Sequence, residues 1–384
     1  MSTRIKEQKT NRQNDRQMKI VADDKIPFLR GALEPVAEVV YKEGKSITRA
    51  DVLDADAIIT RTRTRCDASL LDGTSVKAIF TATIGFDHID TSYCREHGIY
   101  WENAPACNSK SVEQYVASAL ATLKLKHGVA LRGKTVAVVG VGNVGSLVAA
   151  LCERLGMRVL RVDPPRAERE GKEKFTTYEE ALAEADIVTY HTPLLARGEH
   201  PTLHMLDSRA VAMMKPGVIV INSSRGPVCG TRTLVSGLRN HRIGHAVIDV
   251  WENEPDISRD LLSLATIATP HIAGYSTDSK LRGTQMAVSA FCKYFGVTTP
   301  WSAPELPSPE AAVFDASGAR DAEEAACKMF AHVYDIEADM EALRTRTEQF
   351  EKLRGDYHLR REIGSYRLAE GSEYAEYLRN FGIK

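Results

Sequence analysis

The sequence has no long apolar run, no excess of charge of one sign and no closely spaced cysteine pair, and each absence excludes a class of protein. No stretch approaches the ~18 consecutive apolar residues that a membrane-spanning helix needs. Lysine and arginine number 50 and aspartate and glutamate 51, so the net charge of −1 does not favour nucleic acid or an anionic membrane as a partner. The seven cysteines are scattered, which predicts free thiols in a reducing compartment. We therefore expect a cytoplasmic protein without a nucleic-acid, membrane or metal partner.

The first 17 residues contain almost no side chain that could be buried. They also lack the apolar core of a signal peptide, and they predict a disordered lead-in before Met18. A second sparse stretch, TTPWSAPELPSP, holds four prolines in twelve residues and predicts a linker over 297–309. Because 384 residues exceed the usual size of one hydrophobic core, two or three domains are expected.

Two series of short apolar runs alternate with amphipathic segments, the pattern of βαβ units in an α/β fold with parallel sheets. The first series predicts strands at 19–23, 57–60, 78–83 and 99–103. The second predicts strands at 135–140, 158–163, 186–193, 218–224, 245–251 and 266–271. Helices are expected between the strands of the second series and after them, at 143–155, 177–185, 207–214, 230–241, 258–264, 278–294 and 319–347. Six nearly continuous apolar strands match a doubly wound dinucleotide-binding domain covered on both faces.

A long helix is expected between the two series. Ser111 is a plausible N-cap, and the helix should run to His127 with Gly128 as its stop signal.

A glycine-rich turn follows the first strand of the second series. It reads Gly140, Val141, Gly142, Asn143, Val144 and Gly145, the G-x-G-x-x-G spacing at a strand-to-helix junction. Glycines there allow a tight turn and close approach of a pyrophosphate, whose charge the free N–H groups of the helix start attract. Asp163, at the end of the next strand, would bind ribose hydroxyls and repel a 2′-phosphate. The turn and Asp163 together predict NAD as the cofactor.

Charged residues stand at the expected carboxyl ends of three strands, where ligands of a doubly wound sheet bind. Arg225 can fork onto a carboxylate and keeps its charge. His271 can exchange a proton near neutrality, and the carboxylate of Glu254 can orient its imidazole. These three residue types predict hydride transfer at a 2-hydroxy acid with His271 as the acid–base group. His191 remains a competing base.

Five segments, GVGNVG, HTPL, NSSRGPV, DVWENEP and TPHIAGY, resemble the D-isomer-specific 2-hydroxyacid dehydrogenases in order and spacing. The resemblance covers about residues 18–295 and implies that Arg225 binds substrate, Glu254 assists and His271 donates or accepts the proton. It implies further cofactor contacts at Thr192, Ser223, Ser224, Arg225, Asp249 and Gly274. The family's first domain is split, which here implies a flavodoxin-like substrate domain of 18–110 plus 273–296 and a Rossmann-type NAD-binding domain of 111–272.

The opening KIVADDKIPF and the tail HVYDIEADMEALR resemble a subgroup of this family that acts on a phosphorylated substrate. Members of the subgroup carry a small α+β dimerisation domain, which here implies a homodimer formed through residues 310–384. The sequence of that region shows no chemistry of its own.

The resemblance to the subgroup also implies substrate contacts at Thr62, Thr83 and Tyr275. The run Arg61-Thr-Arg63-Thr-Arg65 would place three guanidiniums on one face if the chain is extended there. We expect Arg61 or Arg63 to hold the substrate phosphate.

The sequence differs from the family pattern at one position, and two alternative functions remain open. The family usually has an aspartate where this chain has Gly230, and that aspartate would cap the following helix. One alternative is another phosphorylated or plain 2-hydroxyacid dehydrogenase, such as a 3-phosphoglycerate enzyme, although the tyrosine-rich tail does not resemble that enzyme's regulatory domain. The other is an NAD-sensing binding protein of the corepressor type, against which the presence of Arg225, Glu254 and His271 argues.

Overall fold

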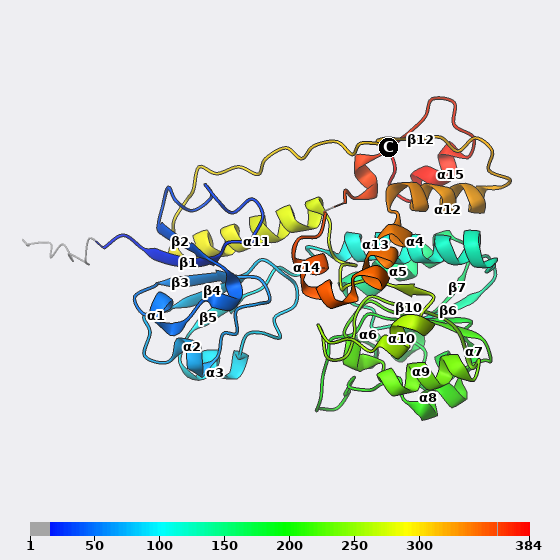
Figure 1. Cartoon of the computed structure of the whole chain (residues 1–384), viewed down its shortest axis with the longest axis horizontal. Helices are drawn as coiled ribbons and strands as arrows, with labels where there is room; N and C mark the ends of the chain where they lie inside the picture. Colours follow the sequence, from blue (N-terminus) through cyan, green and yellow to red (C-terminus); the bar gives the residue numbers. More distant parts are fainter. Residues whose placement is uncertain (1–15, 359) are drawn as a thin grey trace, which may run out of the picture. The chain divides into compact units, whose positions relative to one another are not determined.

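The computed structural model describes residues 16–358 and 360–384, and it divides the chain into two compact units (Figure 1). The first unit comprises residues up to 104 together with 281–304, and the second comprises 105–280 together with 305–384. The predicted disordered lead-in lies outside the described residues as far as residue 15. Arg16 is described, and its guanidinium lies 2.9 Å from a carboxylate oxygen of Asp56.

The first unit is built on a five-stranded parallel sheet of order β2-β1-β3-β4-β5, the flavodoxin-like order. Its strands are β1 Lys19–Asp23, β2 Glu38–Lys42, β3 Ala57–Thr60, β4 Ala78–Thr81 and β5 Tyr100–Glu102. Its short helices are η1 Gly44–Ser46, α1 Arg49–Val52, α2 Ala68–Leu71 and α3 Thr91–Glu96. The sequence did not predict β2, because no residue of this edge strand is fully buried and the strand has no continuous apolar run.

The returning helix expected at 278–294 is α11, Thr277–Phe295, and the boundary between the two units falls within it. Its C-terminal part packs on the first sheet. The ring of Phe291 lies edge-on to that of Phe80, with 5.9 Å between centroids. The Thr284 hydroxyl donates to the Pro27 carbonyl at 2.7 Å. The polypeptide therefore returns to complete the first unit, through residues 281–304.

The second unit is built on a six-stranded parallel sheet of order β11-β10-β9-β8-β6-β7. Its strands are β6 Thr135–Val139, β7 Arg158–Val162, β8 Ile187–Tyr190, β9 Val218–Asn222, β10 Ile243–Ile248 and β11 Ile267–Ala268. Its helices up to residue 264 are α4 Ser109–His127, α5 Asn143–Arg154, α6 Pro164–Glu170, η2 Lys172–Lys174, α7 Tyr178–Glu184, α8 Ser208–Met213, η3 Gly226–Val228, α9 Thr231–Arg239 and α10 Arg259–Leu264. The α/β class, the parallel sheets and the Rossmann-type domain are confirmed.

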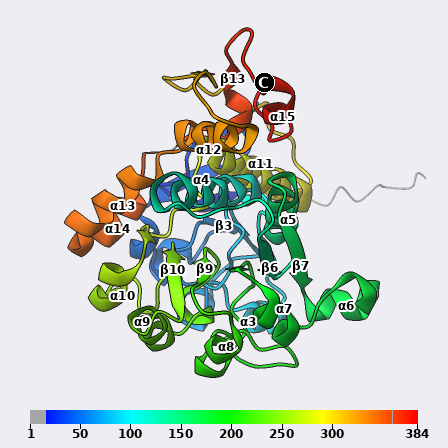
Figure 2. The ribbon, with the colours of Figure 1, turned by 90° about the vertical axis from the view of Figure 1, so that its right-hand side faces the viewer.

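The two faces of this sheet bury alternate side chains, as the strand period requires. Val136 and Val138 of β6 belong to the core on the side of α4 and α5, whereas Ala137 and Val139 belong to the core on the side of α7 to α10. Figure 2 shows α4 on one side of the strands and α8 and α9 on the other. This double cover explains why the strands read as continuous apolar runs.

Helix α4 ends as expected but starts earlier. Gly128 has φ 70° and caps the C-terminus in the left-handed conformation. The first helical residue is Ser109, with Asn108 at the N-cap position. The prediction of Ser111 as the N-cap is therefore wrong, because Ser111 lies inside the first turn and is fully buried.

The C-terminal region is helical with a small parallel pair of strands. Its elements are β12 Val313–Phe314, α12 Ala322–Val333, α13 Ile336–Thr345, η4 Thr347–Gln349, α14 Phe350–Gly355, η5 Ile363–Ser365, β13 Arg367–Leu368 and α15 Ala375–Arg379. The single helix expected at 319–347 is interrupted at Tyr334, and the Asp335 carboxylate caps α13 by accepting two backbone N–H groups.

Helix α12 lies along α4, and the two helices share one apolar core (Figure 2). Met329 and Phe330 of α12 and Tyr115 and Leu120 of α4 are all at most 3 % exposed. No helix among the described residues has the length and apolarity to cross a membrane.

Candidate active site

The glycine-rich turn has the geometry that a dinucleotide phosphate requires. Gly140 has φ 85°, and a Cβ on Gly145 would lie 1.9 Å from the Gly140 carbonyl oxygen, so both positions need glycine. A Cβ on Gly142 would meet no atom within 4 Å, so the backbone is open on that side. Helix α5 starts at Asn143 without a side-chain cap, and its first N–H groups are therefore suited to bind an anion.

Asp163 follows β7 and binds the same turn. Its carboxylate accepts from the backbone N–H groups of Val141 at 2.8 Å and Arg166 at 3.1 Å. The Arg166 guanidinium forms two hydrogen bonds, of 2.8 and 2.6 Å, with the Glu170 carboxylate. Because Glu170 neutralises this nearby cation, the surroundings of Asp163 favour a ribose hydroxyl over a 2′-phosphate.

Two hydroxyl groups at strand ends are buried without a hydrogen-bond partner among the described residues. They are the Oγ1 of Thr192, after β8, and the Oγ of Ser223, after β9. Buried hydroxyls are normally satisfied, so unsatisfied ones at the carboxyl edge of this sheet are suited to a polar ligand. Together with the open glycine turn, they fit an NAD molecule along this edge.

Arg225 lies in a turn that its neighbours hold firmly. The Asn222 side chain donates to the Arg225 carbonyl at 3.0 Å and accepts from the backbone N–H and the hydroxyl of Ser224. Arg225 itself is half-buried and donates to the Ser224 carbonyl at 2.8 Å. Ser224 is thus engaged with Asn222. A Cβ on Gly226 would lie 2.0 Å from the carbonyl group of Trp251, so glycine lets the Arg225 turn contact the loop that carries Glu254.

His271 and Glu254 form a direct pair. The His271 Nδ1 lies 2.7 and 3.0 Å from the two carboxylate oxygens of Glu254, which also accepts from the Trp251 N–H at 3.0 Å. This contact fixes the hydrogen on Nδ1 and leaves Nε2 as the proton acceptor. The His271 side chain is 25 % exposed, so the protein does not enclose the ring completely.

The pKa values of the pair are lowered. Burial lowers the pKa of His271, and the positive charge of Arg354 adds to that effect against the opposing influence of Glu254. Burial alone would raise the pKa of Glu254, but His271, Arg354 and the Trp251 N–H outweigh burial and hold it below the ordinary value. The neutral imidazole and the ionised carboxylate are therefore the resting forms near neutrality.

Asp249 supports the loop that follows His271. Its carboxylate accepts from the Thr269 hydroxyl at 2.7 Å and from the N–H groups of Ile272 at 2.8 Å and Ala273 at 2.9 Å. Burial raises the pKa of Asp249. In the same loop, Gly274 leaves no room for a Cβ, which would lie 2.4 Å from the Asn108 amide nitrogen.

His191, the alternative base, lies in a different setting. Its Nε2 contacts the Thr189 hydroxyl at 2.9 Å and no carboxylate among the described residues. Burial lowers the pKa of His191 to about 3. A base needs a pKa closer to the working pH, so the geometry favours His271.

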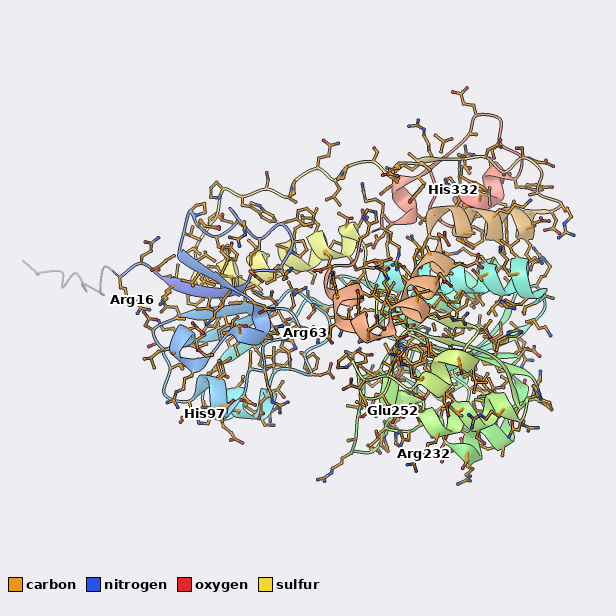
Figure 3. The ribbon with its side chains drawn as sticks, viewed as in Figure 1. Arg16, Arg63, His97, Arg232, Glu252 and His332 are labelled. Carbon is orange, nitrogen blue, oxygen red and sulfur yellow. The ribbon has the colours of Figure 1, made fainter. Side chains whose placement is uncertain are left out.

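The substrate-contact candidates of the first unit lie in loops after β3 and β4. The Arg61 Nε donates to the buried Asp23 carboxylate at 3.1 Å. Thr62 and Arg63 follow in the same loop, which is bent at 62–64 (Arg63 is labelled in Figure 3). The alternation of an extended strand therefore does not apply to the arginine run. The Thr83 hydroxyl donates to the Gly85 carbonyl at 3.0 Å.

Comparison with known proteins agrees with this geometry. Residues 108–273 match the family described as D-isomer specific 2-hydroxyacid dehydrogenase, NAD binding domain. An erythronate-4-phosphate dehydrogenase of Bacteroides fragilis is 47 % identical over 91 % of this chain and 99 % of that protein. A protein of the same name from Cronobacter sakazakii is 40 % identical over 91 % of this chain and 93 % of that protein. The chain belongs to the erythronate-4-phosphate dehydrogenase family. It is an NAD-dependent D-2-hydroxyacid dehydrogenase.

A solved structure supports the fold and the cofactor of this erythronate-4-phosphate dehydrogenase family member. The D-lactate dehydrogenase from Aquifex aeolicus, complexed with NAD and lactic acid, has a TM-score of 0.63 and 27 % identity. It covers 72 % of this chain and 95 % of its own. Residues 306–382 match a separate family that is described only as a domain of unknown function, DUF3410.

The N-terminus of α9, where the family resemblance implied an aspartate in place of Gly230, is capped from another segment. Gly230 is the N-cap residue of α9 and makes no side-chain cap. Glu252 (labelled in Figure 3) accepts the Thr231 N–H at 2.6 Å and contacts the His204 Nε2 at 2.7 Å. This dehydrogenase thus caps α9 with a residue of its DVWENEP segment.

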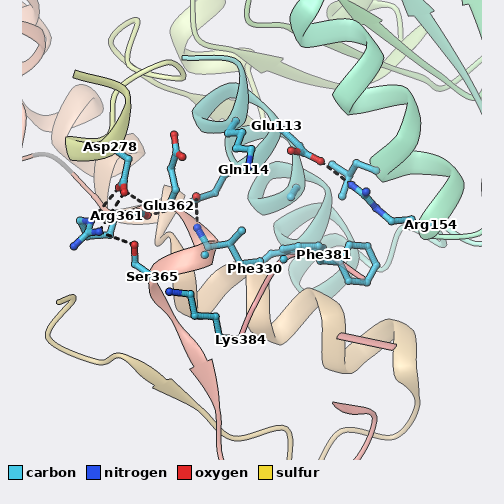
Figure 4. A pocket seen from close by; sticks show the side chains of 16 residues that line it. Glu113, Gln114, Arg154, Asp278, Phe330, Arg361, Glu362, Ser365, Phe381 and Lys384 are labelled. Carbon is cyan, nitrogen blue, oxygen red and sulfur yellow. Dashed lines mark hydrogen bonds and ion pairs between the residues drawn. The ribbon is translucent and has the colours of Figure 1, made fainter. Parts of the chain in front are cut away.

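A cavity of about 390 Å³ lies where the C-terminal region meets α4 and α5 (Figure 4). Four of its charged groups form two ion pairs, Arg154 with Glu113 at 2.7 Å and Arg361 with Asp278 at 3.0 Å. Arg225, Glu254 and His271 do not line it. The chemistry of the strand ends therefore locates the candidate active site better than the size of this cavity does.

Sequence reasoning missed three residues that hold the candidate site. Asn222 looked like an ordinary strand end, although its place directly before the SSRG segment could have indicated a turn clamp. Arg354 and Arg360 come from the C-terminal region, to which the sequence assigned no chemistry. No local pattern in the sequence indicates that they lie against the His271 loop.

Proposed function

We propose that this dehydrogenase oxidises 4-phospho-D-erythronate at C2 to 2-oxo-3-hydroxy-4-phosphobutanoate in vitamin B6 biosynthesis. The observation that supports the chemistry is the contact between His271 Nδ1 and Glu254, with Nε2 left for the substrate. The identity of the substrate rests on relatives of that name that match nearly the whole chain.

Three residues divide the chemical work in this proposal. The Arg225 guanidinium binds the substrate carboxylate through paired hydrogen bonds and so fixes the orientation of C2. The His271 Nε2 takes the proton of the C2 hydroxyl as the carbonyl forms, and Glu254 stabilises the resulting imidazolium. NAD, when bound, accepts the hydride from C2. The glycine turn 140–145 would hold its pyrophosphate, and Asp163 its ribose.

We propose further cofactor contacts at six residues near the strand ends: Thr192, Ser223, Ser224, Arg225, Asp249 and Gly274. Ser223 and Thr192 have unsatisfied hydroxyls that support this role. The Asp249 carboxylate is already engaged with Thr269, Ile272 and Ala273, so its direct role is to shape the cofactor edge.

A panel of 2-hydroxy acids tests the proposed function. Purified protein with NAD should reduce the cofactor fastest with 4-phosphoerythronate, followed as the absorbance of reduced nicotinamide. Erythronate, 3-phosphoglycerate and D-lactate should each give a lower kcat/KM. A higher kcat/KM with 3-phosphoglycerate would favour the alternative enzyme. Tight NAD binding without turnover of any compound would favour an NAD-sensing protein.

We also propose substrate contacts at Thr62, Thr83, Tyr275 and Arg61 or Arg63, with Arg63 the candidate for the phosphate. Replacing Arg61 with alanine would leave the buried Asp23 carboxylate without its partner and cost folding stability, so Arg63 gives the cleaner test. Arg63→Ala should raise KM for 4-phosphoerythronate about 10-fold, since a charge-assisted hydrogen bond contributes ~1.5–3 kcal/mol. Arg65→Ala is the matched control, because that side chain is 79 % exposed in the same loop. An unchanged KM in Arg63→Ala would remove Arg63 from the phosphate site.

The assembly and location remain proposals as well. We propose a cytoplasmic homodimer joined through residues 310–384, with residues 297–309 as a linker and 111–272 as the NAD-binding domain. Support for the separate domain comes from the match of residues 306–382 to a family of its own, and support for the location comes from the seven free cysteines, six of which are buried. Sedimentation of the full chain should give about twice the 42.4 kDa monomer mass, and a monomer would refute the dimer.

A further inference from the structure

The C-terminal region places an arginine beside the His271–Glu254 pair. Arg354 lies on α14, and its Nη1 is 3.5 Å from the same Glu254 oxygen that lies 2.7 Å from His271 Nδ1. The Arg354 side chain is 11 % exposed. Glu254 therefore lies between the imidazole and a buried guanidinium.

Burying the Arg354 guanidinium costs free energy unless its charge interacts favourably with another group. Removing a guanidinium from water is unfavourable, and an apolar side chain of similar size would fill the same volume without that cost. A hydrogen bond joins Arg354 to Tyr275, and Glu351 lies near on the same helix. The Arg354 Nε is buried with no hydrogen-bond partner among the residues that the structure describes. Packing alone does not explain the choice of arginine.

A second arginine of the same segment fixes the loop that carries His271. The Arg360 Nη2 donates to the Ala273 carbonyl at 2.7 Å and the Ser111 carbonyl at 3.2 Å, and its Nη1 donates to the Ile272 carbonyl at 3.3 Å. His271 itself has φ 59°, a strained conformation for a residue with a Cβ. Such a conformation persists only where surrounding contacts hold it, and Arg360 supplies two of them, to the carbonyls of Ile272 and Ala273.

Residues 360–362 are anchored to α4 and to the residues that follow the His271 loop. Thr277 donates its N–H to the Arg360 carbonyl at 2.9 Å. The Arg361 guanidinium pairs with Asp278. The Glu362 carboxylate accepts from the hydroxyls of Ser111 and Ser276 at 2.8 and 3.1 Å (Figure 4 shows the neighbouring contacts). Residues 360–362 are thus held in place next to the loop that carries His271.

We propose that the C-terminal domain completes the proton relay: Arg354 is a positioning residue that keeps Glu254 ionised and directed at His271. The domain that matches a family of unknown function thereby acquires a catalytic task in addition to assembly. This inference rests on the proposed roles of His271 and Glu254. It concerns a residue outside the family's NAD-binding domain, which matches only residues 108–273.

The expected consequence is a change in proton transfer and not in substrate binding. The charged groups that face His271 are Glu254 and Asp249 from the loops after β10 and Arg354 from α14. Arg354 opposes the positive charge of a protonated His271 and favours the negative charge of Glu254. Without Arg354 the imidazole takes up a proton at higher pH, and Glu254 is less firmly held. In the oxidation direction, less neutral base is then present at a given acidic pH.

Arg354→Met and Arg354→Lys test this role, with Lys352→Met as the control from an exposed position on the same helix. In Arg354→Met, kcat for 4-phosphoerythronate should fall about 10- to 100-fold, the cost of a misplaced catalytic group. KM should stay within about 2-fold, because the contacts that bind the substrate itself are left in place. The acid limb of the pH–rate profile should move to higher pH. Arg354→Lys should recover much of kcat, and Lys352→Met should match the wild type.

A measurement without substrate separates this inference from the proposed function. The ring ¹⁵N shifts of the histidines, with His271 assigned by its loss in His271→Ala, give the pH at which His271 titrates. That pH should be lower in the wild type than in Arg354→Met, and Arg354→Lys provides the comparison if the methionine variant does not fold. Equal titration, or a loss confined to KM with an unchanged pH profile, would overturn the positioning role. Failure of the wild type to oxidise any hydroxy acid would instead overturn the proposed function.

Discussion

Replacing His271 with alanine lowers kcat at least about 100-fold, the lower end of the effect of a general acid–base group. In the proposed mechanism the His271 Nε2 takes the substrate proton, and Glu254 holds Nδ1. The remaining His191 cannot substitute, because burial lowers its pKa to about 3. Initial rates of nicotinamide reduction measure the effect. NADH binding, followed by fluorescence, should be retained because the glycine turn is untouched.

An exposed histidine gives the control for this variant. His97→Ala, at the end of α3 in the first unit, should keep wild-type kcat. Turnover of His271→Ala within about 3-fold of the wild type would be far above the expected loss and would point to another base.

The pH dependence of the wild type follows from the same geometry. In the proposed mechanism oxidation needs neutral His271, and burial together with Arg354 lowers the pKa of this residue below the ordinary value of 6.5. A lowered pKa means that the neutral form persists to lower pH, so kcat/KM for oxidation should be maintained below pH 6.5 before it falls. Reduction needs the protonated form and should slow as the pH rises.

Replacing Gly226 with alanine should damage stability and activity together. Its Cβ would lie 2.0 Å from the Trp251 carbonyl group and 2.5 Å from the Glu252 nitrogen, and backbone atoms cannot move aside as a flexible side chain can. We expect the free energy of unfolding to fall by about 3 kcal/mol, the upper range for overpacking. Because Arg225 and Glu254 lie in the two loops that would be forced apart, kcat/KM should fall about 100-fold. Urea unfolding and initial rates measure the two effects.

Gly364→Ala controls for the general cost of alanine, since its nearest atom would be 3.8 Å away. That variant should unfold within about 0.5 kcal/mol of the wild type. If Gly226→Ala were equally stable and active, the close approach of the two loops would not limit this site.

The sequence predicted what depends on local pattern. Both faces of β6 and β8 to β10 are buried, so their apolar runs were visible, and the glycine turn and its cofactor followed from spacing. The partly exposed strand β2 and the true start of α4 were missed, because an edge strand lacks an apolar run and Ser111 is buried by distant residues. The role of Arg354 could not be predicted either, because it also depends on contacts with distant residues. Its partner Glu254 is 100 positions away, and only the folded chain brings the two together.

The core shared by α12 and α4 determines what a cut in the proline-rich stretch would do. A protease that cleaves between Pro304 and Glu305 breaks one covalent bond, but Met329 and Phe330 remain buried against Tyr115 and Leu120. These four large apolar side chains are at most 3 % exposed, and exposing each of them to water would cost about 1.5–3 kcal/mol. The C-terminal piece would therefore stay associated as a noncovalent fragment, and Arg354 would stay beside Glu254. A nicked preparation would show two bands on a denaturing gel and still behave as one particle.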